Sequence, residues 1–357
     1  MPPARLEELG FDARLAEAFA ALGRPELVPG RVVLQYRKSW LVATDTDDVS
    51  AELPGRVRRA TKAADLPTVG DFVALEPASN GPARLTNVLP RQGALVRHAA
   101  GVVTTPQVLA ANIDVLFLVS GLDRDFNPRR IERFLTVALQ SGAMPVIVLN
   151  KIDICPDVED CVAEAEIVAL GAPVLTISAR HQRGLEALRP YLGPGRTAAI
   201  VGSSGVGKST LVNALLGEER MPTGEVRAND QRGRHVTTRR ELVVLPDGQG
   251  CLIDTPGLRE LQLWGDASAL SASFADVETL AAQCRFGDCS HEREPGCAVR
   301  EALASGALPE ERWDSYRTLQ GELATLRQRT RDHEARTDGR RLSKASRQVE
   351  RIKKPPE

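Results

Sequence analysis

The sequence has few aromatic residues, almost no net charge and no long apolar run. Aromatic side chains make up 4% of its 357 residues, which argues against an extended surface on which nucleic-acid bases stack. Lysine and arginine number 46 against 47 aspartates and glutamates, so any basic surface for nucleic acid must be local. No apolar run approaches the roughly 18 residues that a membrane-spanning helix needs. We therefore expect no membrane partner.

The N-terminus also lacks the apolar core of a secretory signal. Glu7, Glu8 and Asp12 lie where that core would be. The chain is therefore expected in the cytoplasm, where disulfides are rare. Its 42% of hydrophobic residues can form a buried core, and its length predicts two or three domains.

The first 96 residues predict a helical arm followed by a small barrel. Leu15, Phe19 and Leu22 share one helical face within residues 1–27, which favours a docking helix. Residues 28–96 alternate short β-type runs with glycine and proline turns, a pattern typical of a five-stranded barrel of the OB type. The five predicted strands are 31–36, 40–44, 56–61, 71–76 and 84–89.

Positive charge is concentrated on the third of these predicted strands and just after it, at Arg56, Arg58, Arg59 and Lys62. One interpretation is a face that binds nucleic acid. The other is an edge strand whose charges prevent aggregation. The residues alone leave both interpretations open.

Residues 97–265 alternate strands and helices in the pattern of a doubly wound α/β sheet. The chain is predicted to be mostly helical over 266–328, and a basic, mobile tail is predicted over 329–357. The predicted strands of the α/β region are 114–120, 145–150, 173–178, 197–202, 241–245 and 250–254, with helices that include 128–140 and 208–216.

The strongest motif matches the phosphate loop G-x-x-x-x-G-K-[ST]. It follows a predicted strand and opens a predicted helix, which is the context that this loop requires. Its glycines let backbone N–H groups surround phosphate oxygens at a helix N-terminus, whose dipole favours negative charge. Lys208 is expected to reach the β- and γ-phosphates, and Ser209 to ligate Mg²⁺. The predicted phosphate site comprises Gly202, Ser203, Ser204, Gly205, Val206, Gly207, Lys208, Ser209 and Thr210.

A tetrapeptide N-K-x-D follows another predicted strand and predicts guanine recognition. The carboxylate of Asp153 can accept hydrogen bonds from both the ring N1–H and the exocyclic amine of guanine, a donor pair that adenine lacks. Asn150 is expected to brace the loop, and the stem of Lys151 to cover the base. A Ser-Ala pair, Ser178 and Ala179, ends the next strand, where GTPases commonly contact the guanine carbonyl. The tetrapeptide comprises Asn150, Lys151, Ile152 and Asp153.

A D-x-x-G motif spans Asp254 to Gly257 at the end of a further predicted strand. Asp254 is expected to hold Mg²⁺ through water, and the N–H of Gly257 to contact the γ-phosphate. Residues 217–240 precede this strand and are rich in glycine, arginine and polar residues. We expect them to form a switch that orders with GTP, in which a threonine completes the Mg²⁺ coordination.

The order of these motifs differs from that of most GTPases. Here the N-K-x-D and Ser-Ala motifs precede the phosphate loop, whereas they usually follow it. This order predicts a circular permutation, which can preserve the site because the same strand ends still meet at one edge of the sheet. The D-x-x-G strand then leads directly into the C-terminal region.

A second strong signal is a cluster of three cysteines and one histidine with the spacing C-x4-C-x-H-x5-C. Three thiolates and an imidazole are the ligands of a closed structural Zn²⁺ site, and a full set of four protein ligands argues against a catalytic metal. The cluster comprises Cys284, Cys289, His291 and Cys297. Cys155, Cys161 and Cys251 stand apart and are interpreted as small core or surface residues.

With this permuted motif order and this Cys/His cluster, the chain resembles the bacterial ribosome small subunit-dependent GTPase A family over about residues 30 to 325. The resemblance implies hydrolysis of GTP to GDP and phosphate, late maturation of the small ribosomal subunit, and rRNA contacts from the OB and zinc regions. The family switch usually reads Gly-Arg-His-Thr-Thr-Thr, but Val236 replaces the first threonine here. Thr237 or Thr238 is therefore the candidate Mg²⁺ ligand. The chain is expected to act as a monomer.

Leu258 follows the D-x-x-G glycine, where many GTPases have a glutamine that orients the attacking water. We therefore expect slow intrinsic hydrolysis. His235 is the candidate to orient the water, with stimulation when the small subunit orders the switch. The alternative is that His235 braces the switch or contacts rRNA.

Two other functions remain open at this point. A permuted GTPase could act on another RNA assembly, such as the large subunit. A protein of a different class, a GTP-dependent binding scaffold, would hydrolyse GTP only incidentally.

Overall fold

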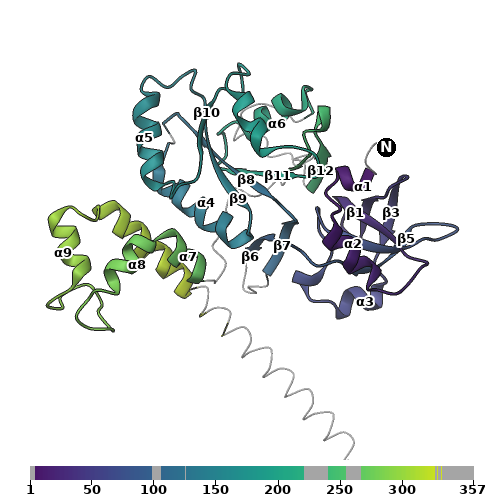
Figure 1. Ribbon diagram of the computed structural model, residues 1–357, viewed down its shortest axis with the longest axis horizontal. Coiled ribbons are helices and arrows are strands. Elements are labelled where there is room, and N and C mark those ends of the chain that lie inside the picture. The colour runs from purple at the N-terminus through teal and green to yellow at the C-terminus, as the bar shows by residue number, and fades with distance from the viewer. Residues whose placement is uncertain are drawn as a thin grey trace, which may run out of the picture. The chain divides into compact units, whose positions relative to one another are not determined.

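The computed structural model describes residues 5–98, 106–124, 126–220, 240–254, 267–325, 328 and 331 (Figure 1). The chain divides into two compact units, residues 1–97 with 107–262, and residues 98–106 with 263–357. In the part of the chain that is described, no helix is both long and apolar enough to cross a bilayer.

A closed five-stranded barrel forms the start of the first unit, as predicted. The strands pair in the order β1-β2-β3-β5-β4, and β1 also pairs with β4, which closes the barrel. Its interior is filled by buried apolar side chains such as Val32, Val42 and Leu85. The strands are β1 (Val28–Gln35), β2 (Ser39–Ala43), β3 (Asp48–Glu52), β4 (Phe72–Glu76) and β5 (Ala83–Val88).

The predicted strand over 56–61 is wrong, because residues Gly55–Ala60 form helix α3. The apolar side chain in this run, Val57, is 41% exposed, so the segment has no buried face of the kind that a barrel strand requires. The actual third strand, β3, buries only Ala51, and its otherwise polar pattern concealed it. The basic side chains therefore lie on a helix and in the turn that follows it, which excludes the edge-strand interpretation.

The N-terminal arm forms two short helices, α1 (Arg5–Glu8) and α2 (Ala13–Ala20). The carboxylate of Asp12 caps α2 by accepting a hydrogen bond from the N–H of Leu15 at 2.8 Å. Leu15 packs against Phe72 and Leu89 of the barrel region, with Phe19 and Leu22 around them. The apolar face predicted from the sequence is thus the face that docks.

The six strands predicted in the α/β region are all present, with ends within one or two residues of the prediction. They lie in the order β10-β9-β8-β11-β13-β12, and only β12 is antiparallel to its neighbour within this set. Their bounds are β8 (Val115–Gly121), β9 (Met144–Asn150), β10 (Val174–Ile177), β11 (Thr197–Gly202), β12 (Arg240–Val244) and β13 (Cys251–Asp254).

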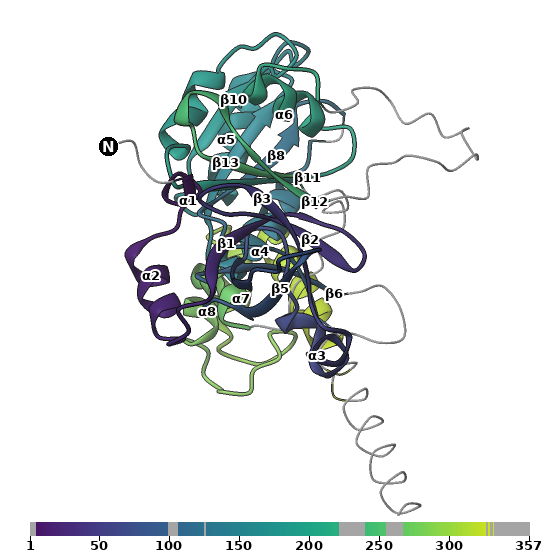
Figure 2. The same ribbon diagram turned by 90° about the vertical axis from the view of Figure 1, so that its right-hand side faces the viewer.

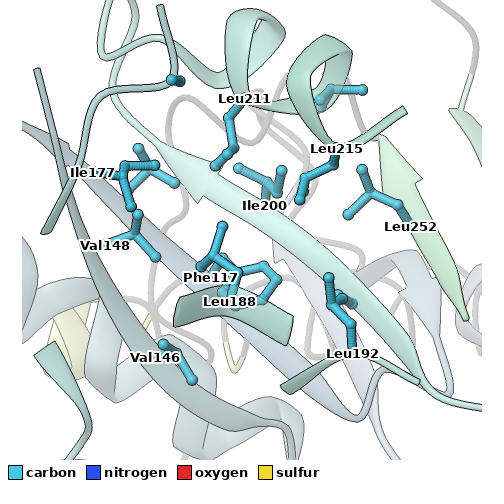
Figure 3. Packing of buried hydrophobic residues seen from close by; sticks show 14 of the residues in the cluster. Phe117, Val146, Val148, Ile177, Leu188, Leu192, Ile200, Leu211, Leu215 and Leu252 are labelled. Carbon is cyan, nitrogen blue, oxygen red and sulfur yellow. The ribbon is translucent and has the colours of Figure 1, made fainter. Parts of the chain in front are cut away.

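Helices α4 (Pro128–Ser141), α5 (Val158–Val168) and α6 (Lys208–Leu216) and the 3₁₀ helix η2 (Leu185–Tyr191) connect these strands. Side chains from the strands, α6 and η2 interlock in one apolar core, in which Phe117, Leu188 and Leu211 are fully buried (Figure 3). This core holds the strand ends in fixed relative positions.

The barrel and the α/β sheet are continuous, which the sequence did not indicate. Strand β1 pairs with β12 through Leu34 opposite Glu241 and Gln35 opposite Arg240, so eleven strands form one sheet (Figures 1 and 2). A separate two-stranded ribbon of β6 (Ala94–His98) and β7 (Pro106–Ala111) lies between the two regions in the sequence. The barrel is therefore joined to the strand that follows the predicted switch.

The second unit is helical, with α7 (Ala267–Ser273), α8 (Ala275–Ala281), α9 (Ala298–Ser305) and a helix over 310–325. The guanidinium of Arg312 lies 4.1 Å from the ring centre of Phe274 and pairs with Asp276 at 2.9 Å. This pair ties the last helix to the start of α8. The predicted basic tail lies almost entirely outside the described residues.

Candidate nucleotide site and metal centre

The predicted nucleotide motifs meet at one edge of the sheet. Gly121 of β8 and Ile177 of β10 both lie opposite Asn150 at the end of β9, and Gly202 of β11 lies opposite Val119 of β8. Since these strands are parallel, their carboxyl ends share this edge, and the loops that follow them converge there. This is where ligands bind in open α/β sheets.

The phosphate-loop segment connects β11 to α6, and its last residue before the helix is Gly207, whose φ is 93°. A Cβ atom at this position would lie 2.4 Å from the side-chain nitrogen of Asn150, so only glycine fits. The ammonium of Lys208 donates to the carbonyl of Gly202 at 2.8 Å and also to that of Ser203. These contacts hold the lysine over the start of the loop.

Asn150 links two of the converging loops. Its amide nitrogen donates to the carbonyl of Val206 at 2.8 Å, and its amide oxygen accepts from the N–H of Ala179 at 2.9 Å. The residue is 3% exposed. Because both polar atoms of this buried amide are satisfied, the phosphate loop and the Ser178–Ala179 turn are held at a defined distance from each other.

Asp153 is held as an ionised acceptor. The hydroxyl of Ser178 donates to its carboxylate at 2.5 Å, and the side chain of His181 lies 3.6 Å from the other carboxylate oxygen. The hydrogen bond from Ser178 is the main cause that lowers the pKa of Asp153. A carboxylate that stays ionised is what the bidentate contact with guanine requires.

Lys151 has the left-handed φ of 72° and forms an ion pair with Asp123, which follows β8. The pair fixes the lysine stem beside the loop. Sequence reasoning missed both Asp123 and His181, because neither belongs to a motif and each reaches the site only through the fold.

The remaining predicted site residues are described only in part. Asp254 ends β13, which runs parallel to the phosphate-loop strand with Ile253 opposite Ala199. Strand β12 begins at Arg240, the last residue of the predicted switch. The side chain of Asp254 lies outside the described residues, as do Gly257, His235, Thr237 and Thr238.

The four predicted metal ligands come together in the second unit, with all their ligand atoms within 4.8 Å of one another. The sulfurs of Cys284 and Cys297 are 3.8 Å apart, and Nδ1 of His291 lies 3.5 Å and 3.4 Å from them. A tetrahedral zinc with bonds of about 2.3 Å to sulfur and about 2.05 Å to nitrogen places two sulfurs about 3.8 Å apart, and sulfur and nitrogen about 3.5 Å apart. The group therefore fits a metal ion of this size.

The surroundings of the metal group act in opposite directions on two of its thiols: they lower the pKa of Cys284, whereas burial is the main cause that raises the pKa of Cys289 to about 11. Burial alone would raise the pKa of Cys284, but hydrogen bonds from the backbone N–H groups of Val299 and Ala298, at the start of α9, lower it overall. The ring of His291 meets the indole of Trp313 edge-on at 5.5 Å, and Trp313 stacks on Tyr316. These aromatic contacts, which sequence reasoning missed, join the metal group to the last helix.

Known proteins share both the sequence and this fold. The family model described as RsgA GTPase matches residues 88–264, and one described as ABC transporter matches residues 185–352, a range that contains the phosphate loop. The chain is 48% identical over 351 residues to a small ribosomal subunit biogenesis GTPase RsgA from Opitutus terrae, covering 95% of each chain. It is 44% identical to the protein of that name from Syntrophotalea carbinolica, covering 90% of each.

Two solved structures are also similar. The crystal structure of YjeQ from Thermotoga maritima shares 29% identity and a TM-score of 0.62, covering 84% of this chain and 99% of that one. The structure of YloQ, described as a circularly permuted GTPase, has a TM-score of 0.58 at 22% identity, and it covers 84% of this chain and 96% of that one. The second likeness supports the permuted fold alone.

Proposed function

Since the chain belongs to the RsgA family of GTPases, we propose that it binds the small ribosomal subunit and its rRNA and assists the subunit's late maturation. It is a GTPase, which hydrolyses GTP to GDP and phosphate. The observation that supports the site assignment is the pair of hydrogen bonds made by Asn150, one donated to the carbonyl of Val206 in the phosphate loop and one accepted from the N–H of Ala179.

In this proposal the two ends of GTP are bound by different loops. Asp153 accepts from the guanine ring, the stem of Lys151 covers the base, and the turn at Ser178 and Ala179 supplies a backbone N–H. Lys208 and the N–H groups of the phosphate loop bind the phosphates. Ser209 and, through water, Asp254 would hold Mg²⁺, which would neutralise phosphate charge, and the N–H of Gly257 would contact the γ-phosphate.

The second unit is proposed to be a structural zinc domain. Its four ligands leave no position for water or substrate, so the metal would stabilise the fold and take no part in hydrolysis. The division of the chain into an arm (1–27), barrel (28–96), GTPase domain (97–265), zinc domain (266–328) and basic tail (329–357) belongs to the same proposal. So do the monomeric state and a cytoplasmic location.

We expect isolated small subunits to raise GTP turnover by at least tenfold, because docking orders the segment that positions the attacking water. We propose His235 for that role, with Thr237 or Thr238 completing the Mg²⁺ shell. Steady-state phosphate release with and without small subunits measures the effect, and large subunits serve as the control. His235→Ala should lose most of the stimulation and keep its GTP affinity.

Equal stimulation by large subunits would favour the RNA-assembly alternative. Subunit binding that depends on GTP, with no stimulated turnover, would favour a binding scaffold. A fully stimulated His235→Ala variant would show that rRNA or the backbone orients the water.

Helix α3 is proposed to contact rRNA phosphates. Arg56 and Arg59 are exposed on it, Lys62 follows it, and Arg58 donates to the carbonyl of Arg37 at 2.7 Å, which fixes α3 against the β1–β2 turn. Positive charge held by a rigid element suits contacts with the phosphate backbone.

We predict that the double variant Arg56→Gln/Arg59→Gln binds small subunits more weakly at low salt. The slope of log affinity against log salt should become shallower by about one to two, because binding with fewer phosphate contacts releases fewer counterions from the RNA. Binding titrations at several salt concentrations measure this slope. Arg183→Gln/Arg189→Gln removes the same charge from exposed positions elsewhere in the first unit, and an equal loss in that control would contradict an α3 contact.

A further inference from the structure

Two thiols that the sequence analysis treated as unrelated meet beside the guanine-recognition loop. Cys155 lies two residues after Asp153, and Cys161 lies in the first half of helix α5. Their sulfur atoms are 3.9 Å apart, and both side chains are half-buried. Of the other four cysteines, Cys251 is fully buried and three belong to the metal group.

Small molecules can reach this pair. Cys155 and Cys161 both line a cavity of about 700 Å³, which is also bordered by Asp123, the ion-pair partner of Lys151. The same cavity therefore touches the two thiols and the residue that fixes the lysine of the guanine-recognition motif. A chemical change at the thiols occurs next to the proposed base site.

We propose that Cys155 and Cys161 form a reversible disulfide that makes the affinity for guanine nucleotides depend on the thiol redox state. The nucleotide part of this inference rests on the proposed function, whereas formation of the disulfide does not. A low-molecular-weight disulfide such as oxidised glutathione is the oxidant.

The reaction is a thiol–disulfide exchange in two steps. The thiolate of Cys155 attacks one sulfur of oxidised glutathione, whose S–S bond breaks, and the departing thiolate takes up a proton. The thiolate of Cys161 then attacks the sulfur of Cys155 and expels the second glutathione thiolate, which is protonated in turn. The two protein thiols lose two protons and two electrons, and the reagent gains both and becomes two thiols.

The environment of the pair sets the order of these steps. Burial, together with the hydrogen bond to Cys155, raises the pKa of Cys161 to about 11. Cys161 therefore keeps its proton while Cys155 makes the first attack. Once Cys155 is in the mixed disulfide, its hydrogen bond and charge no longer raise the pKa of Cys161, whereas burial still does, and the ionised fraction of Cys161 completes the exchange.

Closure of the disulfide would strain the base loop. An S–S bond of about 2.0 Å brings the two sulfurs about 1.9 Å closer than they are now. Rotation of the side chains absorbs part of this change, and the rest pulls residue 155 toward α5. The N–H of Ile154, which precedes Cys155, donates to the carbonyl of Lys151 at 3.1 Å. A displacement of residue 155 is therefore transmitted to Lys151, which covers the base in the proposed site. We expect a roughly three- to tenfold weaker affinity for GDP.

The test uses the full-length chain with its metal bound. It is equilibrated in glutathione redox buffers, free thiols are blocked with N-ethylmaleimide, and the linkage is mapped by mass spectrometry of the proteolytic peptides. The affinity for a fluorescent GDP analogue and the metal content are measured in the same samples. We expect a Cys155–Cys161 linkage in the oxidising buffers, an unchanged metal content, weaker GDP binding, and reversal by dithiothreitol.

Cys155→Ser and Cys161→Ser are the matched variants, since each replaces a thiol with a hydroxyl of similar size. Both should bind GDP as the reduced wild type does and should lose all redox sensitivity. A glutathione adduct without the internal linkage would overturn the proposal, as would a linkage that leaves GDP affinity unchanged. If the reduced wild type fails to bind GDP, the proposed function itself is refuted, and peptide mapping still decides whether the disulfide forms.

Discussion

Asp153→Asn is expected to lower the affinity for GTP by about 100-fold or more and to raise the affinity for XTP. The carboxylate accepts two hydrogen bonds from guanine, and an amide can accept only one of them, leaving a donor unpaired in the site. Xanthine carries a carbonyl where guanine carries the exocyclic amine, so the side-chain NH₂ of the new asparagine can donate to it. Equilibrium titrations with fluorescent GDP and XDP analogues measure the ratio of the affinities for guanine and xanthine nucleotides, which should fall in the variant.

The Asp153→Asn substitution is expected to leave the local hydrogen bond with Ser178 in place, so that a change in affinity reports the contact with the base. Ser178 donates to the residue at position 153, and an amide oxygen can accept this bond as a carboxylate does. Asp160→Asn is the matched control, because it removes an exposed carboxylate from α5 outside the motif. Unchanged GTP and XTP affinities in Asp153→Asn would contradict the assignment of the base site.

Cys297→Ser is expected to reduce the bound metal from about one ion per chain to nearly none and to unfold the second unit. Cys297 is 2% exposed, and its sulfur lies against both Cys284 and His291. In metal-dependent domains of this kind, the metal contributes about 10 kcal/mol or more of apparent binding free energy to folding. Elemental analysis for zinc gives the metal content, and limited proteolysis shows whether residues 267–325 remain protected.

Binding of GTP by this variant should largely survive, because the nucleotide site belongs to the other compact unit. Cys161→Ser is the matched control, since it removes a half-buried thiol that is no part of the metal group. A native chain that contains no zinc would refute the identity of the metal. A Cys297→Ser chain that keeps its zinc would refute the ligand set.

Part of the fold was predictable because its signals are local. Four of the six strands of the α/β region, β9, β10, β11 and β13, are short apolar runs followed by a motif, and α6 begins directly after Gly207 of the phosphate loop. Local spacing also identified the four metal ligands, which do come together. In the barrel, by contrast, β3 buries only Ala51, so it carries almost none of the alternation by which a strand is recognised.

Other features arise only when distant segments pack together. Asp123 and His181 reach the base loop because β8, β9 and β10 end side by side, and Trp313 reaches His291 although it lies in a later helix of the chain. Cys155 and Cys161 approach each other because the loop after β9 folds back on α5. None of these contacts leaves a pattern in the surrounding residues.

By itself the sequence determined the motifs on which the proposed chemistry rests: the phosphate loop, the N-K-x-D tetrapeptide, their permuted order and the Cys/His group. These depend on residue types at fixed short spacings, where the backbone leaves few conformations open. The tertiary structure alone decided that α3 is a helix, that β1 pairs with β12, and that Asn150 joins two loops. Such pairings depend on which surfaces are buried together, and burial is a property of the whole folded chain.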